Sequence, residues 1–204
     1  MSRPSAVRPR GRYIAAALGA VSAFAVLPVA ASAAITAPPG FQVSTFASST
    51  TLSKPDDIVR LDGHLFVTWQ NNAGADGLPA GSASTVVEYS DSGATVNQWT
   101  ITGRVDGLGA DPVKHRIYAT INEDQNSSFE IIDPNASAAA QLQALSYSPA
   151  PVGGFLPHGG GTDAVSVDGF GNILVTASNP GGGTPTDTAS VYKATVNTGP
   201  ARSR

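Results

Sequence analysis

The chain has 204 residues, no cysteine and a net charge of −3, and only 13% of its residues are charged. A chain without cysteine has no disulfide framework. Its few Lys and Arg residues provide no basic surface for a phosphate backbone, so nucleic acid is excluded as a partner.

The first 33 residues form a predicted secretory signal peptide. Four arginines, with no acidic residue among them, precede an apolar, alanine-rich stretch from Ile14 to Ala31. The small residues Ala31-Ser32-Ala33 suit a signal peptidase, so we expect cleavage near Ala33 and a secreted, extracellular protein. A membrane anchor is the alternative. Because Gly19 and Pro28 interrupt the apolar run, we expect no stable membrane insertion once the signal is removed.

Removal of this segment leaves residues 34–204, enough for one domain. It also removes four arginines, which takes the net charge from −3 to −7. The remaining sequence sustains no helical periodicity over three turns. Short β-branched and aromatic runs alternate instead with Gly, Pro, Asn and Asp. This pattern predicts an all-β domain, which is a sandwich, a barrel or a propeller.

A repeat favours the propeller among these three. Three segments share an acidic start, a short apolar strand, a tight turn and a second strand that ends in Thr. The second strands begin at Leu65, Ile117 and Ile173, at spacings of 52 and 56 residues. Four strands per unit at this spacing predict propeller blades. The expected strands are 55–59, 65–68, 85–89 and 98–101 in the first unit, 105–108, 117–120, 129–133 and 141–147 in the second, and 162–165, 173–176 and 190–193 in the third.

The predicted ring is incomplete. About three four-stranded blades are present, whereas closed propellers have four to eight blades. We expect residues 41–46, which precede the first unit, to form the outer strand of a last blade. Open sheet edges would still remain at both ends, and proteins normally avoid such edges. Two explanations stay open: a truncated propeller, which we favour, and a homo-oligomer in which copies of the chain complete the ring.

Acidic and amide side chains recur in the two loops that open on one face of each predicted blade. Carboxylate and amide oxygens are the ligands that hard cations prefer, with calcium first among them, and carboxylates also act as general bases. The alternative is that these residues serve the turns, which Asp and Asn favour. The predicted metal ligands are Asp57, Asp106, Asn122, Glu123 and Asp163, and the further residues predicted to line the mouth of the channel are Asp56, Asn71 and Asn179.

The unit Pro55-Asp56-Asp57-Ile58 and its successors resemble six-bladed propellers of the gluconolactonase and NHL-repeat kind. The run from Asp106-Gly107-Leu108 to Asn122-Glu123-Asp124 also resembles a group of bacterial exported propeller proteins without an established function. The gluconolactonase resemblance implies a divalent cation at the channel mouth, held by carboxylate and amide side chains from several blades. The chain departs from the group in two places. Thr162-Asp163-Ala164 keeps one acid where the group has an aromatic residue and two acids, and Arg104-Val105 stands where a His-Asn pair is common.

Three functional classes follow from these observations. The first, which we favour, is a non-catalytic exported propeller that binds a protein, a glycan or an ion through its mouth. The second is a metal-dependent hydrolase of the lactonase type, in which the predicted ligands hold a divalent ion that polarises a lactone carbonyl while a free carboxylate activates water. The third is a fragment with no function of its own.

Overall fold

The computed structural model describes residues 35–148, 150, 152–156, 160–177 and 190–196. The predicted signal peptide and Asn179 lie outside these residues. The chain separates into two units, Met1–Val43 and Ser44–Arg204, and every described strand belongs to the second unit. No helix in the described part of the chain is long and apolar enough to cross a membrane.

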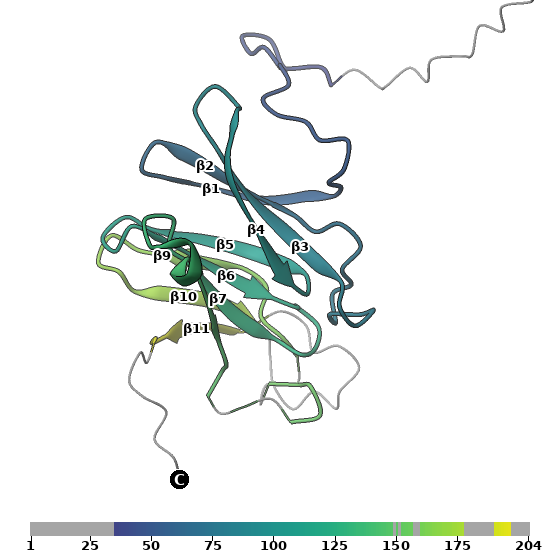
Figure 1. Ribbon diagram of the computed structural model, residues 1–204, viewed down its shortest axis with the longest axis vertical. Coiled ribbons are helices and arrows are strands. Elements are labelled where there is room, and N and C mark those ends of the chain that lie inside the picture. Colours follow the sequence, from purple (N-terminus) through teal and green to yellow (C-terminus); the bar gives the residue numbers. More distant parts are fainter. Residues whose placement is uncertain (1–34, 149, 151, 157–159, 178–189, 197–204) are drawn as a thin grey trace, which may run out of the picture. The chain divides into compact units, whose positions relative to one another are not determined.

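The described strands form three antiparallel sheets, and in each sheet the hydrogen-bonded neighbours follow the order of the chain (Figure 1). The first sheet contains β1 (Pro55–Leu61), β2 (His64–Trp69), β3 (Ala83–Tyr89) and β4 (Thr95–Thr102). The second sheet contains β5 (Val105–Asp111), β6 (Arg116–Ile121), β7 (Ser128–Ile132) and β8 (Leu142–Leu145), with a 3-10 turn over Ala138–Ala140 before β8. The third sheet contains β9 (Val165–Val167), β10 (Ile173–Ala177) and β11 (Ser190–Ala194).

These sheets confirm the prediction of an all-β domain, and each of the three repeats found in the sequence corresponds to one sheet. The propeller ring itself stays a prediction. The strand expected over residues 41–46 is wrong, because these residues form no strand. The ring of Phe46 packs edge-on against Tyr89 of the first sheet, with ring centroids 6.1 Å apart. This side-chain contact places Phe46 against the first sheet rather than at the edge of the last one.

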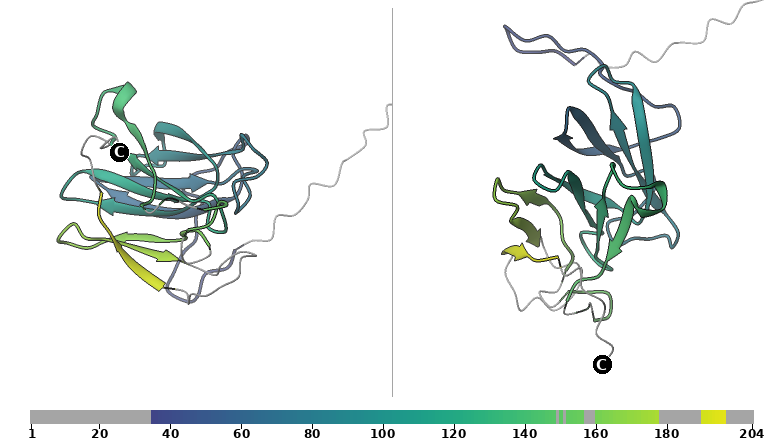
Figure 2. Two further views of the ribbon diagram at one scale, coloured as in Figure 1. Left: turned by 90° about the horizontal axis from the view of Figure 1, so that it is seen from below. Right: turned by 60° about the vertical axis from the view of Figure 1, so that its left-hand side comes forward.

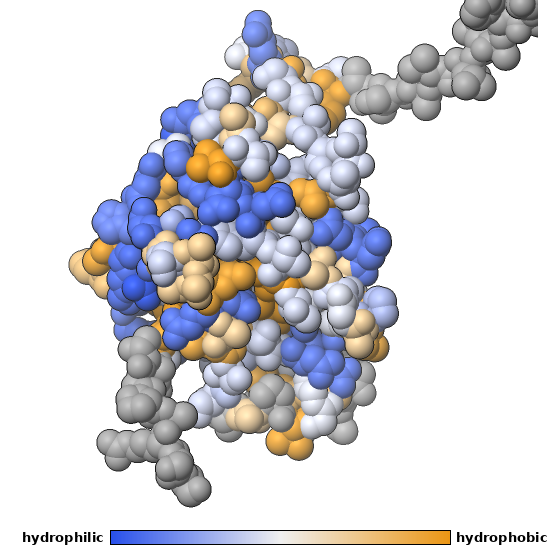
Figure 3. All heavy atoms as spheres, in the orientation of Figure 1, coloured by the Kyte–Doolittle hydropathy of each residue, from blue (hydrophilic) through white to orange (hydrophobic). Residues whose placement is uncertain are grey.

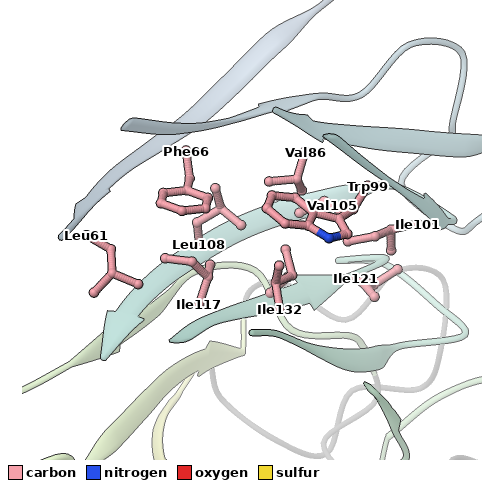
Figure 4. Packing of buried hydrophobic residues seen from close by; sticks show 11 residues of the cluster. Leu61, Phe66, Val86, Trp99, Ile101, Val105, Leu108, Ile117, Ile121 and Ile132 are labelled. Carbon is pink, nitrogen blue, oxygen red and sulfur yellow. The ribbon is translucent and has the colours of Figure 1, made fainter. Parts of the chain in front are cut away.

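The second sheet lies between the other two, because β5 packs against both β1 and β9. Figure 2 shows the three groups of strands from two further directions. The core between the first two sheets contains two aromatic rings, Phe66 and Trp99, that stack with their centroids 6.0 Å apart. Figure 4 shows Leu61, Phe66, Val86, Trp99 and Ile101 of the first sheet directed toward Val105, Leu108, Ile117, Ile121 and Ile132 of the second.

A second core lies between the second and third sheets. Tyr118, Phe129 and Ile131 of the second sheet pack there against Val165, Ile173 and Val175 of the third. The second sheet is therefore covered on both faces, and its strands are apolar on both faces for that reason. In β6, every residue from Ile117 to Ile121 is buried.

The outer faces of the first and third sheets are only partly covered. On the first sheet, Trp69, Val87 and Tyr89 pack beneath residues 47–52, while Ile58 is 54% exposed. On the third sheet, Val191 is 67% exposed. Figure 3 shows apolar side chains between hydrophilic ones on the face that it presents.

The Thr at the end of each predicted second strand is bonded to the start of a first strand. Thr68 Oγ1 accepts a hydrogen bond from Asp57 N (2.9 Å), and Thr176 Oγ1 accepts one from Ala164 N (2.9 Å). The hydroxyl of Thr120 in the second sheet donates to the carbonyl oxygen of Asp163, in the segment that leads into β9. This recurring hydroxyl fixes the backbone where the recurring acidic residue stands.

Candidate functional site: an acidic cluster around Arg104

Each sheet contributes one acidic residue at the start of its first strand. Asp56 is the second residue of β1, Asp106 is the second residue of β5, and Asp163 precedes β9 by two residues. Because β5 packs against both β1 and β9, these three positions come close together. Glu123, in the loop after β6, joins them. We call Asp56, Asp106, Glu123 and Asp163 the acidic cluster.

Two glycines allow the backbone segments of the cluster to approach one another. A Cβ atom at Gly107 would lie only 2.7 Å from the carbonyl oxygen of Asp163, so the missing side chain lets the third sheet reach β5. Gly161 N donates a hydrogen bond to Glu123 O (2.9 Å), and a Cβ atom there would clash with the same carbonyl group. Gly161 is therefore needed for close packing of this segment.

Asp106 is the buried centre of the cluster. Asp106 is 8% exposed, and its Oδ2 accepts a hydrogen bond from Glu123 N (3.1 Å). Its Oδ1 lies 3.4 Å from Nε2 of Gln70, and the same Nε2 donates to Oδ2 of Asp56 at 2.8 Å. The amide of Gln70, which is itself buried, thus joins the carboxylates of the first and second sheets.

Arg104 places one positive charge among these carboxylates. Its Nε lies 2.8 Å from Oδ1 of Asp106, and its Nη1 lies 3.3 Å from Oε1 of Glu123. The Nε–H bond does not point at an acceptor, so the contact with Asp106 is an ion pair without a well-aligned hydrogen bond. One guanidinium therefore pairs with two carboxylates of the acidic cluster, and among the described residues Asp56 and Asp163 form no ion pair.

Burial and neighbouring charges both shift the pKa values of the cluster. Burial raises the pKa of Asp106 to about 7, although the positive charge of Arg104 acts in the opposite direction. Burial is also the main reason why the pKa values of Asp56 and Glu123 lie above their usual range, again against the effect of Arg104. The negative charge of Asp163 raises both of these pKa values further. All four carboxylates therefore share one electrostatic environment.

Two predicted ligands have structural partners instead. Asp57 Oδ2 accepts a hydrogen bond from Leu108 N (2.6 Å), and its Oδ1 accepts one from Ile58 N (2.7 Å). Asp57 thereby connects β1 to β5. Asn122 Oδ1 accepts a hydrogen bond from Arg104 N (2.9 Å), and its Nδ2 donates to Asn126 O (3.0 Å). The sequence grouped these two residues with the acidic ligands because loop position alone does not reveal backbone partners.

Asn71 does not join the cluster either. Its φ angle is +55°, a conformation that Asn tolerates better than most residues. Its Oδ1 accepts a hydrogen bond from Ser53 N (3.1 Å), and its Nδ2 donates to Ala83 O (3.2 Å). Asn71 therefore holds the loop between β2 and β3, which is the turn chemistry that the sequence left as the alternative.

Sequence analysis did not identify Gln70 and Arg104 as members of the site. Gln70 directly follows β2, at the position in the unit where Asn122 follows β6. Arg104 stands between β4 and β5, two residues before the recurring Asp106. A cation beside a recurring acid is the signal that could have indicated the ion pair.

The predicted divalent metal can be tested against these residues. Within the described part of the chain, no three His, Asp or Glu side chains are placed to hold a metal ion together. Asp106 and Glu123 face the guanidinium of Arg104, and Asp57 accepts backbone hydrogen bonds. The donors in this arrangement do not fit a divalent ion, so we derive no chemical step through one.

No family model matches the chain, and no curated protein matches it.

Proposed function

We propose that the chain is an exported β-propeller binding module that takes up a positively charged group at the acidic cluster. The observation that carries the proposal is the ratio of charges. Arg104 pairs with Asp106 and Glu123 and its charge also acts on Asp56, while Asp163 adds a fourth carboxylate whose negative charge acts on Asp56 and Glu123. A second cation would stabilise the ionised forms of Asp56, Asp106 and Glu123, whose pKa values are raised.

The propeller part of the proposal is supported by the repetition of local structure. Two sheets consist of four consecutive antiparallel strands, as blades do. The first strands of neighbouring sheets pack against each other, and the same threonine contact recurs at the strand starts of the first and third sheets. In a propeller these starts lie at one mouth of the central channel, so in the proposed propeller the acidic cluster would lie at that mouth.

The chemistry of the site favours a cation that donates hydrogen bonds, such as an alkylammonium group. Carboxylate oxygens accept such bonds from ammonium groups, and charge-assisted bonds are about twice as strong as neutral ones. Glu123 has a side chain that is 26% exposed, and Asp56 is exposed, so both are accessible from solvent. Asp106 lies behind them and would interact with the ligand mainly through its charge.

Calorimetric titration of the purified protein at pH 8 tests this function. We expect the diammonium compound putrescine to bind, and a Glu123→Gln variant to bind it several-fold more weakly. Asp91→Asn is the matched control, because Asp91 pairs with Arg60 on an exposed surface, outside the cluster. Binding of calcium chloride in place of putrescine would favour the metal alternative. If the protein binds neither compound, the proposal is wrong.

A hydrolase of the lactonase type is the second candidate. It is supported by Asp106, because a carboxyl group with a pKa of about 7 suits a general base near neutral pH. Hydrolysis of simple lactones by the protein, lost in an Asp106→Asn variant, would support this candidate. Cation binding without turnover would support the binding module.

A further inference from the structure

A cavity of about 660 Å³ lies between the second and third sheets, and none of the four residues of the acidic cluster lines it. Its walls come from β7, β8 and the segment after β8 on one side, and from β10, β11 and the residues after β11 on the other. Sites for small organic ligands typically have volumes of about 300–1,000 Å³. The cavity is therefore of the right size for one such molecule.

The walls are mostly apolar. Phe129, Leu145, Leu156, Val175 and Val196 line the space, and most of these side chains also belong to the core between the two sheets. Except for Leu156, which lies between β8 and β9, these residues come from strands or from the residues that follow them. The cavity is thus an extension of a packed core.

Among the polar residues of the wall, which also include Ser146, Ser148 and Thr195, two hydroxyl groups are bonded to each other. Tyr147 and Thr162 both line the cavity, and their oxygens lie 2.7 Å apart in a hydrogen bond. Their mutual bond uses one hydroxyl proton, so the pair retains lone pairs and a second hydroxyl proton with which to meet a ligand. Burial raises the pKa of Tyr147 to about 12, although the bond to Thr162 acts against this increase. The phenol is neutral at physiological pH.

The described wall has little charge. Lys193 is the one described lining residue with a charged side chain, and it is exposed. Hydrogen bonds from Asn172 lower the pKa of Asp168, and the positive charge of Lys193 contributes to the same decrease. A charged group placed among the apolar walls would lose its hydration there, so the described wall favours a neutral ligand.

From these walls we infer a second binding site, separate from the acidic cluster, for a neutral and mainly apolar small molecule that carries one hydroxyl or carbonyl group. The apolar part lies among Phe129, Leu145 and Val175, and the polar group bonds to the Tyr147–Thr162 pair. A ligand without the polar group leaves the second proton of the pair unused and binds more weakly.

Binding of 1-naphthol and of naphthalene to the purified protein, measured by calorimetry, tests this site. We expect 1-naphthol to bind with one-to-one stoichiometry and about tenfold more tightly than naphthalene, the difference that one hydrogen bond supplies. The Tyr147→Phe variant should lose this preference and still bind naphthalene. Equal affinity of the unmodified protein for the two compounds would overturn the proposed ligand class.

The position of the site is tested by filling the cavity. Ala194 lines it, so Ala194→Phe should abolish binding of both compounds, whereas Ala144→Phe on the exposed side of β8 should leave binding unchanged. If Ala194→Phe does not fold, Leu145→Trp fills the same space. An Ile58→Asp variant, which alters the exposed face of the first sheet, should bind normally. Loss of binding in Ile58→Asp, or full binding in the folded filled variant, would overturn the proposed site.

Discussion

Arg104 Nε lies 2.8 Å from Oδ1 of Asp106, two residues further along the chain. The arginine precedes β5 and the aspartate stands at the start of it, so the fold of one short segment fixes both charges. The Asp106 side chain is almost fully buried, whereas that of Arg104 is 27% exposed. The arginine therefore connects a buried carboxylate with the solvent-accessible part of the acidic cluster.

The Arg104→Gln substitution should destabilise the protein at pH 8 by about 2 kcal/mol, because it leaves partly buried carboxylates without their cation. The loss of unfolding free energy should be smaller at pH 5, because more of these carboxylates are protonated at that pH. Urea unfolding at the two pH values measures both effects. Arg60→Gln is the matched control, because the Arg60–Asp91 pair is exposed and should contribute at most about 1 kcal/mol. Equal losses in the two variants would contradict the role given to Arg104.

The raised pKa of Asp106 predicts an unusual dependence of stability on pH. The folded protein binds a proton at this carboxyl up to about pH 7, whereas the unfolded chain releases it near the ordinary value of 3.8. The stabilising contribution of the protonated group is thus complete below pH 3.8 and is lost as the pH rises to about 7. Asp106→Asn imitates the protonated form. Its melting temperature should exceed that of the unmodified protein by a few degrees at pH 8, and the two should converge near pH 4. A difference that does not change with pH would contradict this account.

The threonine contact between strands can be tested at Thr68, which is fully buried. Thr68→Val keeps the shape of the side chain but leaves Asp57 N without its hydrogen bond, so it should cost about 1–2 kcal/mol of unfolding free energy. Thr100→Val on β4, an exposed position, should change stability by less than about 0.5 kcal/mol. Denaturant unfolding measures both values. A neutral Thr68→Val would show that the recurring threonine has no role in fixing the strand start.

The packing of the first two sheets depends on the stacked rings of Phe66 and Trp99. Phe66 is 1% exposed, so Phe66→Ala should cost about 3–5 kcal/mol, through lost burial and the cavity that it leaves. Val96→Ala, at a position that is 52% exposed, should cost little. Calorimetric melting compares the two variants. A small effect of Phe66→Ala would mean that the two sheets are not held together by this core.

Local patterns predicted most of the fold. Alternating β-branched and aromatic residues located the strands, and turn pairs such as Asp62-Gly63, with φ angles of +49° and +87°, located a tight hairpin. The strand expected over residues 41–46 failed, because that segment has an apolar pattern but Phe46 packs on Tyr89 through its ring. A sequence pattern identifies the apolar residues but not the surface against which they pack.

The candidate site was predicted in part for the same reason. The repeat placed Asp106 and Asp163 at corresponding positions, and the structure brings their segments together through β5. The repeat in the sequence did not reveal that Asp57 bonds to Leu108 N or that Asn122 bonds to Arg104 N. These partners depend on loop conformation, as the φ angle of +64° at Asn122 illustrates. Such contacts arise only once the sheets are packed.

The most direct test of the cation-binding function is to measure the pKa of Asp106. Carbon-13 NMR of its side-chain carboxyl measures this pKa with and without saturating putrescine. The free protein should titrate at about 7. A bound cation that prefers the ionised form tenfold lowers this pKa by one unit, so the account predicts a decrease of about one unit or more. A pKa of Asp106 that is unchanged by putrescine would contradict the account.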